Sequence, residues 1–171
     1  MSTQIEDDCM IDVNAIHKSA WAKATDGAPC AHRPFLFDFR QVAGRGIYLY
    51  TRPLGEASPL RAGHSYPLVV RLAATHRAKN PAGKIVERRI SEHELPEWLG
   101  RIFARHGMRV DGIQHAQFEP VKVGRGGLDV LSTVMVAAQV LIEDEAKAAH
   151  AWGHGIGRGK AWGCGTLMLR H

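Results

Sequence analysis

The chain of 171 residues has few cysteines and no long apolar run. Cys9, Cys30 and Cys164 are scattered and form no C-x-x-C pair, which argues against a disulfide framework and against a zinc knuckle. No charged segment followed by an apolar stretch stands at the start, and no apolar run is long enough to cross a membrane. The sequence therefore predicts a cytoplasmic protein of a reducing compartment, with no membrane as a partner.

The glycine-rich stretch near the end lacks both common nucleotide-binding motifs. Residues 155–165 read GIGRGKAWGCG, and no register in them fits the G-x-G-x-x-G pattern. A Walker loop would need Gly and then Ser or Thr where His154 and Ala161 stand. We therefore expect no mononucleotide site in this stretch. Open backbone N–H groups beside Arg158 and Lys160 suit the phosphates of a nucleic acid, and a structural turn is the plainer alternative.

The composition is basic and rich in hydrophobic residues. Hydrophobic residues make up 45% of the chain, which excludes wholesale disorder. Lys and Arg number 22 against 17 Asp and Glu, so the formal net charge is +5. Much of this charge falls in expected loops, which favours an anionic macromolecule as partner over a merely soluble basic surface.

The second half of the chain predicts a β-α-β-β-α-β order, which is the ferredoxin-like arrangement. Strands are expected over 65–75, 108–121 and 128–142, with a short last strand after residue 165. Residues 76–89 indicate a basic loop or hairpin. A helix is expected to begin at a capping box of Ser91 and Glu94 and to end before Gly107. A second helix, with acidic residues at its start, is expected over 143–152.

The first half resembles a shortened copy of the same arrangement. Asp12 can cap a helix that runs to Lys23, and residues 34–39 and 46–51 indicate a hairpin. Residues 52–63 carry Pro and Gly and indicate a linker, and a first strand within 3–11 is only weakly indicated. The expected architecture is therefore α+β, with two tandem ferredoxin-like (RRM-like) modules over residues 1–63 and 64–171.

Two motifs give the chain a family resemblance. Residues 155–165 resemble the C-terminal glycine loop of CasE, the CRISPR repeat-processing endoribonuclease of Cascade in the RAMP superfamily, whose members carry G-I-G-x-A-K-x-x-G-C-G. Residues 12–21 (DVNAIHKSAW) resemble the first helix of that family, and residues 34–37 (PFLF) match the strand that follows. Two departures stand out, since Asn14 replaces a frequent tyrosine and Arg158-Gly159 replaces the usual Pro-Ala.

The resemblance implies an activity and a site. It implies a CRISPR endoribonuclease that cleaves precursor crRNA on the 3′ side of the repeat stem-loop without a metal or another cofactor. Its partners would be the crRNA stem-loop and the subunits of a CRISPR effector complex. The catalytic histidine of the family corresponds to His17, the lysine of its glycine loop to Lys160, and its basic hairpin to residues 124–127. Without the resemblance, His17 is a flanking histidine of an amphipathic helix.

Metal-free RNA cleavage needs a base for the 2′-hydroxyl proton, an acid for the 5′-oxygen and cations for the phosphorane charge. A histidine can move either proton near neutral pH, and the products are a 2′,3′-cyclic phosphate and a 5′-hydroxyl end. His150 and His154 have a metal-binding spacing but no third ligand, so no metal site is predicted. We expect contacts to RNA from Asn14, Lys18, Lys23, Arg77, Lys79, Lys84, Arg88, Arg89, Lys122, Arg125, Gly157, Arg158 and Gly159.

Two further functions remain open at this point. Asn14 and the short first module are also compatible with a subunit that binds crRNA without cleaving it. An unrelated ferredoxin-like protein with a structural glycine loop is the third possibility. Incubation with a labelled repeat RNA separates the first two, and the absence of salt-sensitive RNA binding would favour the third.

Overall fold

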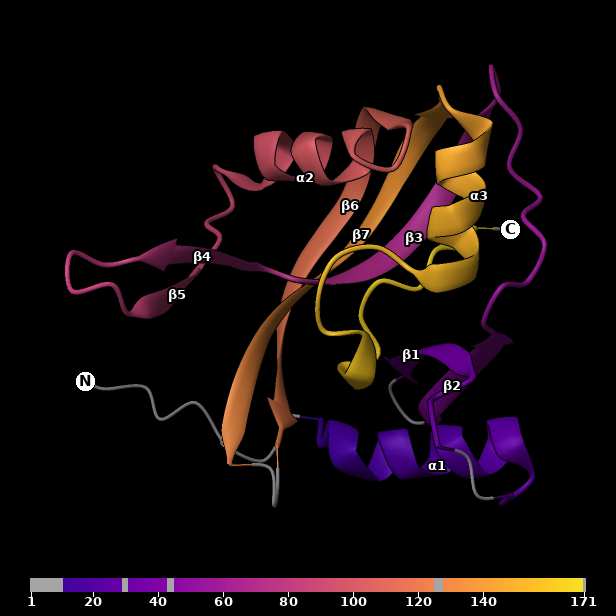
Figure 1. Cartoon of the computed structure of the whole chain (residues 1–171), viewed down its shortest axis with the longest axis vertical. Coiled ribbons are helices and arrows are strands. Elements are labelled where there is room, and N and C mark those ends of the chain that lie inside the picture. The colour runs from indigo at the N-terminus through magenta and orange to yellow at the C-terminus, as the bar shows by residue number, and fades with distance from the viewer. Residues whose placement is uncertain (1–10, 29–30, 43–44, 125–127, 171) are drawn as a thin grey trace.

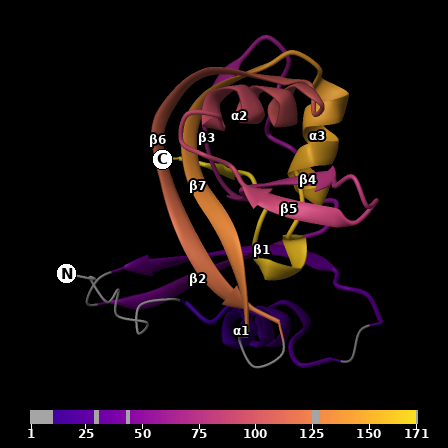
Figure 2. The same cartoon turned by 90° about the vertical axis from the view of Figure 1, so that its left-hand side faces the viewer.

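The computed structural model describes residues 11–28, 31–42, 45–124 and 128–170. Its largest sheet has four antiparallel strands in the order β6-β7-β3-β8. The strands are β3 (Ser65–Ala73), β6 (Met108–Val123), β7 (Asp129–Ile142) and β8 (Met168–Leu169). Helices α2 (Leu95–Ala104) and α3 (Glu145–His154) lie on one face of this sheet (Figures 1 and 2). This is the predicted β-α-β-β-α-β order. Among the described helices, none is long and apolar enough to span a membrane.

Local sequence signals explain where the two helices begin. The Ser91 Oγ accepts the Glu94 N–H at 3.3 Å, and the Glu94 carboxylate accepts the Ser91 N–H at 3.0 Å. This is the predicted capping box, although it closes a turn and the regular helix begins only at Leu95. The Asp144 carboxylate accepts the Lys147 N–H at 3.1 Å and caps α3.

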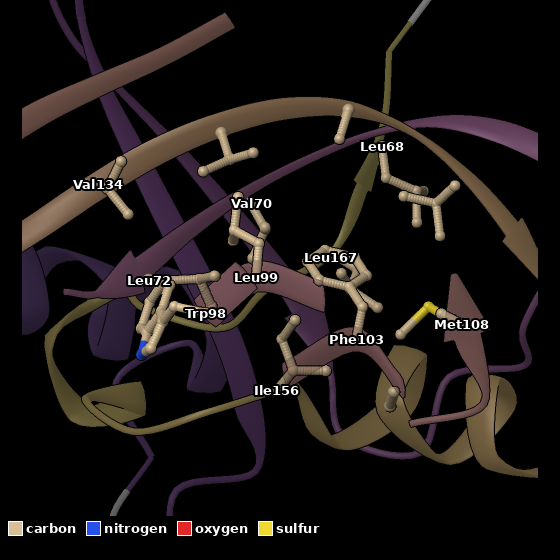
Figure 3. Close-up of a cluster of buried hydrophobic side chains, with 14 of the residues drawn as sticks. Leu68, Val70, Leu72, Trp98, Leu99, Phe103, Met108, Val134, Ile156 and Leu167 are labelled. Atoms are coloured by element: carbon tan, nitrogen blue, oxygen red, sulfur yellow. The ribbon is translucent and has the colours of Figure 1, made fainter. Parts of the chain in front are cut away.

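The apolar sides of these helices pack against the sheet. Alternate residues of β3 point toward α2 and α3, as the period of a strand requires. The resulting core is drawn in Figure 3 and includes Leu68, Val70, Leu72, Trp98, Leu99, Phe103, Met108, Val134, Ile156 and Leu167. Each fully buried Leu or Phe in such a core contributes about 1.5–3 kcal/mol. Ile156 lies at the start of the glycine loop and Leu167 just after its end, so the core holds the loop at both ends.

A basic hairpin is inserted between β3 and α2. Its strands are β4 (Thr75–Lys79) and β5 (Ile85–Arg89), and it projects away from the four-stranded sheet (Figure 1). The Asn80 side chain accepts the Lys84 N–H at 2.8 Å across the turn. The hairpin alternative for residues 76–89 is therefore confirmed.

The first part of the chain forms a helix on a two-stranded sheet. Helix α1 (Val13–Thr25) packs on β1 (Phe35–Val42) and β2 (Gly46–Pro53), which pair antiparallel. Asp12 caps α1, as predicted, and accepts the Asn14 N–H at 2.9 Å. Residues 3–10 of the weakly indicated first strand lie outside the described residues.

The end of β6 completes the core under α1. Val121 and Val123 are buried in one cluster with Val13, Ile16 and Ala20 of the helix and with three phenylalanines of β1. The backbone of Lys122 also donates to the Ile11 carbonyl at 3.0 Å. A strand of the second half therefore supplies part of the core of the first half.

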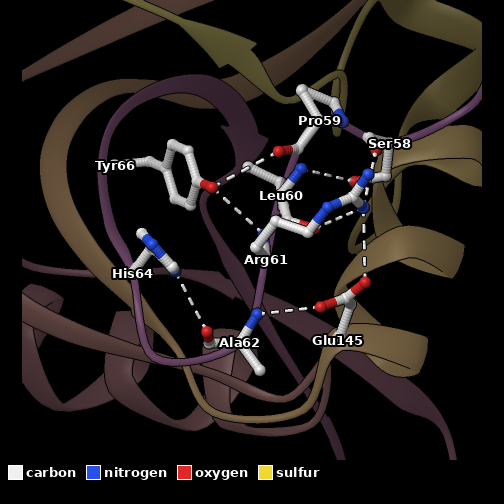
Figure 4. Close-up of polar contacts among 8 residues, drawn as sticks. All are labelled: Ser58, Pro59, Leu60, Arg61, Ala62, His64, Tyr66 and Glu145. Carbon is white, nitrogen blue, oxygen red and sulfur yellow. Dashed lines mark hydrogen bonds and ion pairs between the residues drawn. The ribbon is translucent and has the colours of Figure 1, made fainter.

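The segment between β2 and β3 contains no helix and no strand, in agreement with the predicted linker. It is fastened to α3, because Glu145 accepts hydrogen bonds from the Arg61 side chain at 3.3 Å and the Ala62 N–H at 3.1 Å (Figure 4). Tyr66 closes the same turn through the Pro59 carbonyl at 3.3 Å. The module boundary near residue 63 stays a prediction.

Arg71 joins the two halves from β3. Its guanidinium is buried and lies 3.3 Å from the Asp38 carboxylate and 2.7 Å from the Glu119 carboxylate. It also donates to the Phe39 carbonyl at 3.0 Å. Burial raises the pKa of Asp38 to about 6, although the Arg71 charge acts in the opposite direction.

Arg52, in β2, makes a second connection between the two halves of the chain. Its buried guanidinium lies 3.8 Å from the centre of the Trp152 ring and donates to the Trp152 carbonyl at 2.8 Å. It also donates to the Leu167 carbonyl and is paired with Glu56 at 3.3 Å. Both ends of the glycine loop are thereby tied to the first half of the chain.

Candidate active site at the glycine loop

The glycine loop, residues 155–165, connects α3 to β8 and owes its path to glycine. All five of its glycines have positive φ. A Cβ on Gly165 would lie 2.1 Å from the Ile156 carbonyl oxygen, and a Cβ on Gly163 would lie 3.0 Å from the Phe37 and Phe39 rings. These two glycines serve close packing against the chain itself. The structural alternative for the loop is therefore correct for part of it.

The middle of the loop is more open. A Cβ on Gly157 would meet only the Leu72 side chain, at 3.6 Å, whereas one on Gly159 would lie 3.2 Å from the Cys164 sulfur. Gly157 is exposed and Gly159 half-buried. A short 3-10 helix, η3 (Lys160–Trp162), follows and turns the loop toward α1. The predicted phosphate contacts of Gly157 and Gly159 stay predictions.

His17 lies at the contact between α1 and the glycine loop. Its ring stacks on Phe37 of β1, with centroids 5.6 Å apart and planes 12° apart. Trp21 and Trp162 approach it edge-on, with centroid distances of 6.1 Å and 6.2 Å. Because Trp162 belongs to η3, the fold brings the two motifs of the sequence together around this histidine.

The environment of His17 favours its neutral form. Burial and, second, the charge of Arg33 lower the pKa of the imidazole below its usual value. Its Nε2 atom is buried and has no hydrogen-bond partner among the residues that the structure describes. A neutral imidazole with an unused ring nitrogen can accept a proton near neutral pH.

Arg33 is a site residue that sequence reasoning missed. It stands just before β1, donates to the Lys160 carbonyl, and lies 6.0 Å from the centre of the Phe35 ring. Burial lowers its pKa, and within the described parts of the chain no carboxylate forms an ion pair with it. An arginine before a proline carries no motif, so only the folded contact reveals it.

Lys160, whose carbonyl accepts the hydrogen bond from Arg33, is half-buried. Burial and then the charge of Arg33 lower the pKa of its ammonium group. The charge of Lys160 also affects His106, which follows α2. The pKa of His106 is lowered first by burial and then by the Lys160 charge. The glycine loop thus places its lysine in a cationic region that is partly removed from water.

The other predicted residues near α1 lie on the helix or beside it. The Asn14 amide donates to the Asp12 carboxylate at 2.9 Å, and the Lys23 ammonium donates to the Leu49 carbonyl at 3.3 Å. Lys18 is exposed on α1. Lys122 lies in β6 beside the start of α1, and Arg125 lies outside the described residues.

The predicted residues of the β4–β5 hairpin form a separate group (Figure 1). Arg77 and Arg158 both pair with Glu87, the second at 3.0 Å, and Arg88 pairs with Glu94 at 2.9 Å. The Arg89 guanidinium lies 4.7 Å from the centre of the Phe118 ring. The remaining two cations of this group, Lys79 and Lys84, are exposed.

His150 and His154, which have a metal-binding spacing, both lie in α3. The His150 and His154 rings stack with centroids 4.3 Å apart. Within the described residues, no group of three or more His, Cys, Asp or Glu side chains is arranged to hold a metal ion. The metal independence of any reaction stays a prediction, since a substrate can itself bring an ion.

Comparisons with known proteins identify the fold and the family of this chain. Similar solved structures include Thermus thermophilus Cse3 bound to an RNA that represents a pre-cleavage complex, with 20% identity, a TM-score of 0.67, and coverage of 94% of this chain and 89% of that chain. Cas6e of Escherichia coli K-12 matches with 21% identity, a TM-score of 0.67, and coverage of 92% and 91%. A chain of a CRISPR RNA-guided surveillance complex matches with 19% identity, a TM-score of 0.57, and coverage of 94% and 95%. No curated protein matches in sequence.

These likenesses confirm the predicted fold class, α+β with tandem ferredoxin-like modules. The first module is shortened to α1 and one hairpin within the described residues. The model of the family described as CRISPR associated protein matches residues 51–171, which is more than half of the chain. The chain therefore belongs to the CRISPR-associated protein family, as its resemblance to CasE implied.

Proposed function

We propose that this protein is a CRISPR repeat-RNA endoribonuclease. In this proposal it cleaves precursor crRNA on the 3′ side of the repeat stem-loop and keeps the mature crRNA within an effector complex. The observation that carries the proposal is the contact of His17 with Trp162 of the glycine loop, which joins a proton acceptor to a cationic loop. The similar chains are described as a CRISPR endoribonuclease bound to RNA and as part of an RNA-guided surveillance complex, which supports the same class of activity.

The proposed chemistry uses this chain, its RNA and solvent water. His17 takes the proton of the 2′-hydroxyl, and the 2′-oxygen attacks the adjacent phosphorus. The bond to the 5′-oxygen then breaks, and that oxygen takes up a proton from solvent. The products are a 2′,3′-cyclic phosphate and a 5′-hydroxyl end. The lowered pKa of His17 supports the role of base, because the neutral imidazole predominates near neutral pH.

Two cations are proposed to offset the charge of the phosphorane. Three observations support this role for Arg33. Its guanidinium is half-buried, and its charge lowers the pKa of His17. It donates to the Lys160 carbonyl, and no carboxylate of the described residues forms an ion pair with it. Lys160 supports it through its position on the glycine loop, where Arg33 binds its carbonyl. A cation in a site partly removed from water acts more strongly on such a charge than an exposed one.

The central test is the His17→Ala variant with a labelled repeat RNA. We expect cleavage to fall by about a hundred-fold or more, since a general base contributes about 10²–10⁴ in rate. RNA binding, measured by gel shift, should persist. A 2′-deoxy sugar at the cleaved nucleotide should block the wild type, and a chelator should not.

The matched control is His64→Ala, because His64 is an exposed histidine that lies in the segment before β3. It should cleave as the wild type does. Full cleavage by His17→Ala would remove His17 from the mechanism, and dependence on a divalent ion would refute the metal-free route.

The alternative function is a subunit that binds crRNA without cleaving it. One observation at Asn14 favours this alternative. Its side-chain amide is hydrogen-bonded to the Asp12 carboxylate, and an amide cannot supply the phenolic proton of the tyrosine that is frequent in the family. Intact repeat RNA in a stable complex with the wild-type protein would establish this alternative. An Asn14→Tyr variant that gains cleavage would identify the reason.

A further inference from the structure

A cavity lies beside the glycine loop, and His17 is not among the residues that line it. It has a volume of about 290 Å³ and opens between the end of β3, the start of β4, helix α2 and the loop. Its apolar lining consists of Leu72, Ala73, Trp98 and Ile102. Leu72 and Trp98 also belong to the core cluster drawn in Figure 3. The cavity therefore extends from the apolar core to the surface.

The rim of the cavity is strongly cationic. It carries Arg77, Arg101, Arg105 and Arg158, together with His76. Glu87 pairs with the first and last of these arginines, and Glu97 pairs with Arg101. Four arginines against two carboxylates leave a formal excess of two positive charges. The Arg105 side chain forms no ion pair within the described residues, so its donors are available to a ligand.

An apolar lining below a ring of arginines suits one particular chemistry. A nucleotide has a flat base that can enter apolar surroundings and a phosphate that guanidinium groups bind in a bidentate manner. The volume is at the lower end of the range for small-ligand sites, which gives room for one nucleotide and none for a base-paired stem. Proteins read single-stranded RNA through bases that are turned out in this way.

The glycine loop connects this cavity to the candidate active site. Arg158 lines the cavity, and Lys160, two residues later, is bound through its carbonyl to Arg33. Two residues span at most about 7 Å, and successive bases along a strand are about 3.4 Å apart. A single strand that follows the glycine loop can therefore contact both the cavity and the candidate active site.

We propose that the cavity between α2, β4 and the glycine loop receives an unpaired nucleotide of the RNA, next to the bond that is cleaved. The inference rests on the proposed function, and it adds Trp98, Arg101, Ile102 and Arg105 of the α2 region to the RNA-binding surface. It also gives Arg158 a defined role at the border of the two sites. Recognition of this nucleotide fixes the RNA strand beyond the stem.

The first test is an NMR titration of the ¹⁵N-labelled full chain with uridine and adenosine 3′,5′-bisphosphates. Each is a single nucleotide with both of its phosphates. We expect shifts at the Trp98 indole N–H and at the Ile102 and Gly157 amides. Arg105→Gln should weaken binding about tenfold, as the loss of a charged hydrogen bond does. The control Arg109→Gln should bind unchanged, because Arg109 is an equally exposed arginine on β6, away from the cavity.

Two results of the titration would overturn the inference. One is an equal response to inorganic phosphate alone, which would mean an anion patch with no place for a base. The other is an unshifted Trp98 indole with either bisphosphate. Ile102→Phe, which narrows the cavity from its apolar side, should abolish the shifts while circular dichroism reports an unchanged fold.

The second test assigns the nucleotide to the cleaved RNA. Repeat RNA with a 4-thiouridine at successive positions around the cleaved bond is irradiated with the His17→Ala protein, which keeps the RNA whole. Cross-links from an unpaired position to residues 98–105 are expected, and cross-links only from stem positions would refute the inference. Failure of the proposed function is distinct, since it shows as intact RNA after incubation with the wild type.

Discussion

Arg71 and Arg33 both join the two halves of the molecule, but they do so in opposite electrostatic surroundings. Arg71 is buried, and the carboxylates of Asp38 and Glu119 compensate its charge. Arg33 is half-buried and is bonded to a carbonyl, with no carboxylate partner among the described residues. A compensated arginine can stabilise a fold and has little left to offer a ligand. An uncompensated one keeps both charge and donors for a phosphate.

The same difference divides the cations of the surface. Arg77 and Arg88 of the basic hairpin are held by Glu87 and Glu94. Lys79 is exposed in the same hairpin and forms no ion pair within the described residues. We therefore expect Lys79 to contribute more to RNA binding than these two paired arginines.

The largest effect is expected from Arg71→Met, which leaves Asp38 buried without its partner. Breaking such a pair costs about 3–5 kcal/mol, and urea unfolding should show this loss of stability. The double variant Arg71→Met, Asp38→Leu should recover much of it. Arg33→Gln should lose less than about 1 kcal/mol. Equal losses for Arg71→Met and Arg33→Gln would end the distinction between the two arginines.

Arg33→Gln should instead reduce cleavage, by about a hundred-fold, as the loss of one donor to a developing charge does. The pKa of His17 should also rise toward its usual value, because one of the two causes that lower it is removed. Cleavage needs the neutral imidazole, so the acidic limb of the pH–rate profile should move to higher pH. NMR titration of His17 measures this shift without any cleavage, and an unmoved pKa would contradict the electrostatic role of Arg33.

The raised pKa of Asp38 predicts that the stability of the fold depends on pH. Its pKa is raised to about 6 in the fold, from 3.8, so the folded state holds a proton that the unfolded state releases. Stability should therefore fall as pH rises from about 4 to 6, by up to about 3 kcal/mol relative to Asp38→Asn. Parallel stability curves for the two proteins over this range would show that Arg71 keeps Asp38 ionised.

The smallest effect concerns the hairpin. Lys79→Gln should weaken repeat-RNA binding by about 1 kcal/mol. The slope of the logarithm of the binding constant against the logarithm of the salt concentration should become smaller by about one. Arg88→Gln should change binding less, because Glu94 already occupies that guanidinium. A larger loss for Arg88→Gln, in filter binding at two salt concentrations, would show that RNA displaces Glu94.

Sequence patterns predicted what depends on neighbours along the chain. The capping box, the Asp12 cap and the β1–β2 and β4–β5 hairpins follow from residues close together in the sequence. The meeting of His17 with the glycine loop was predicted only through the family resemblance. Arg33 was not predicted, because its contact to Lys160 joins residues 127 positions apart and has no periodicity. The cavity was missed for the same reason, since three separate segments of the chain line it.

The valines at the end of β6 have a consequence for synthesis of the protein. The helix that carries His17 leaves the ribosome early, and β1 covers part of its apolar face, but the core under the helix is completed only by Val121 and Val123. The glycine loop follows later still. A chain that stops before Val121 therefore has an incomplete core under α1 and lacks the loop that contacts His17.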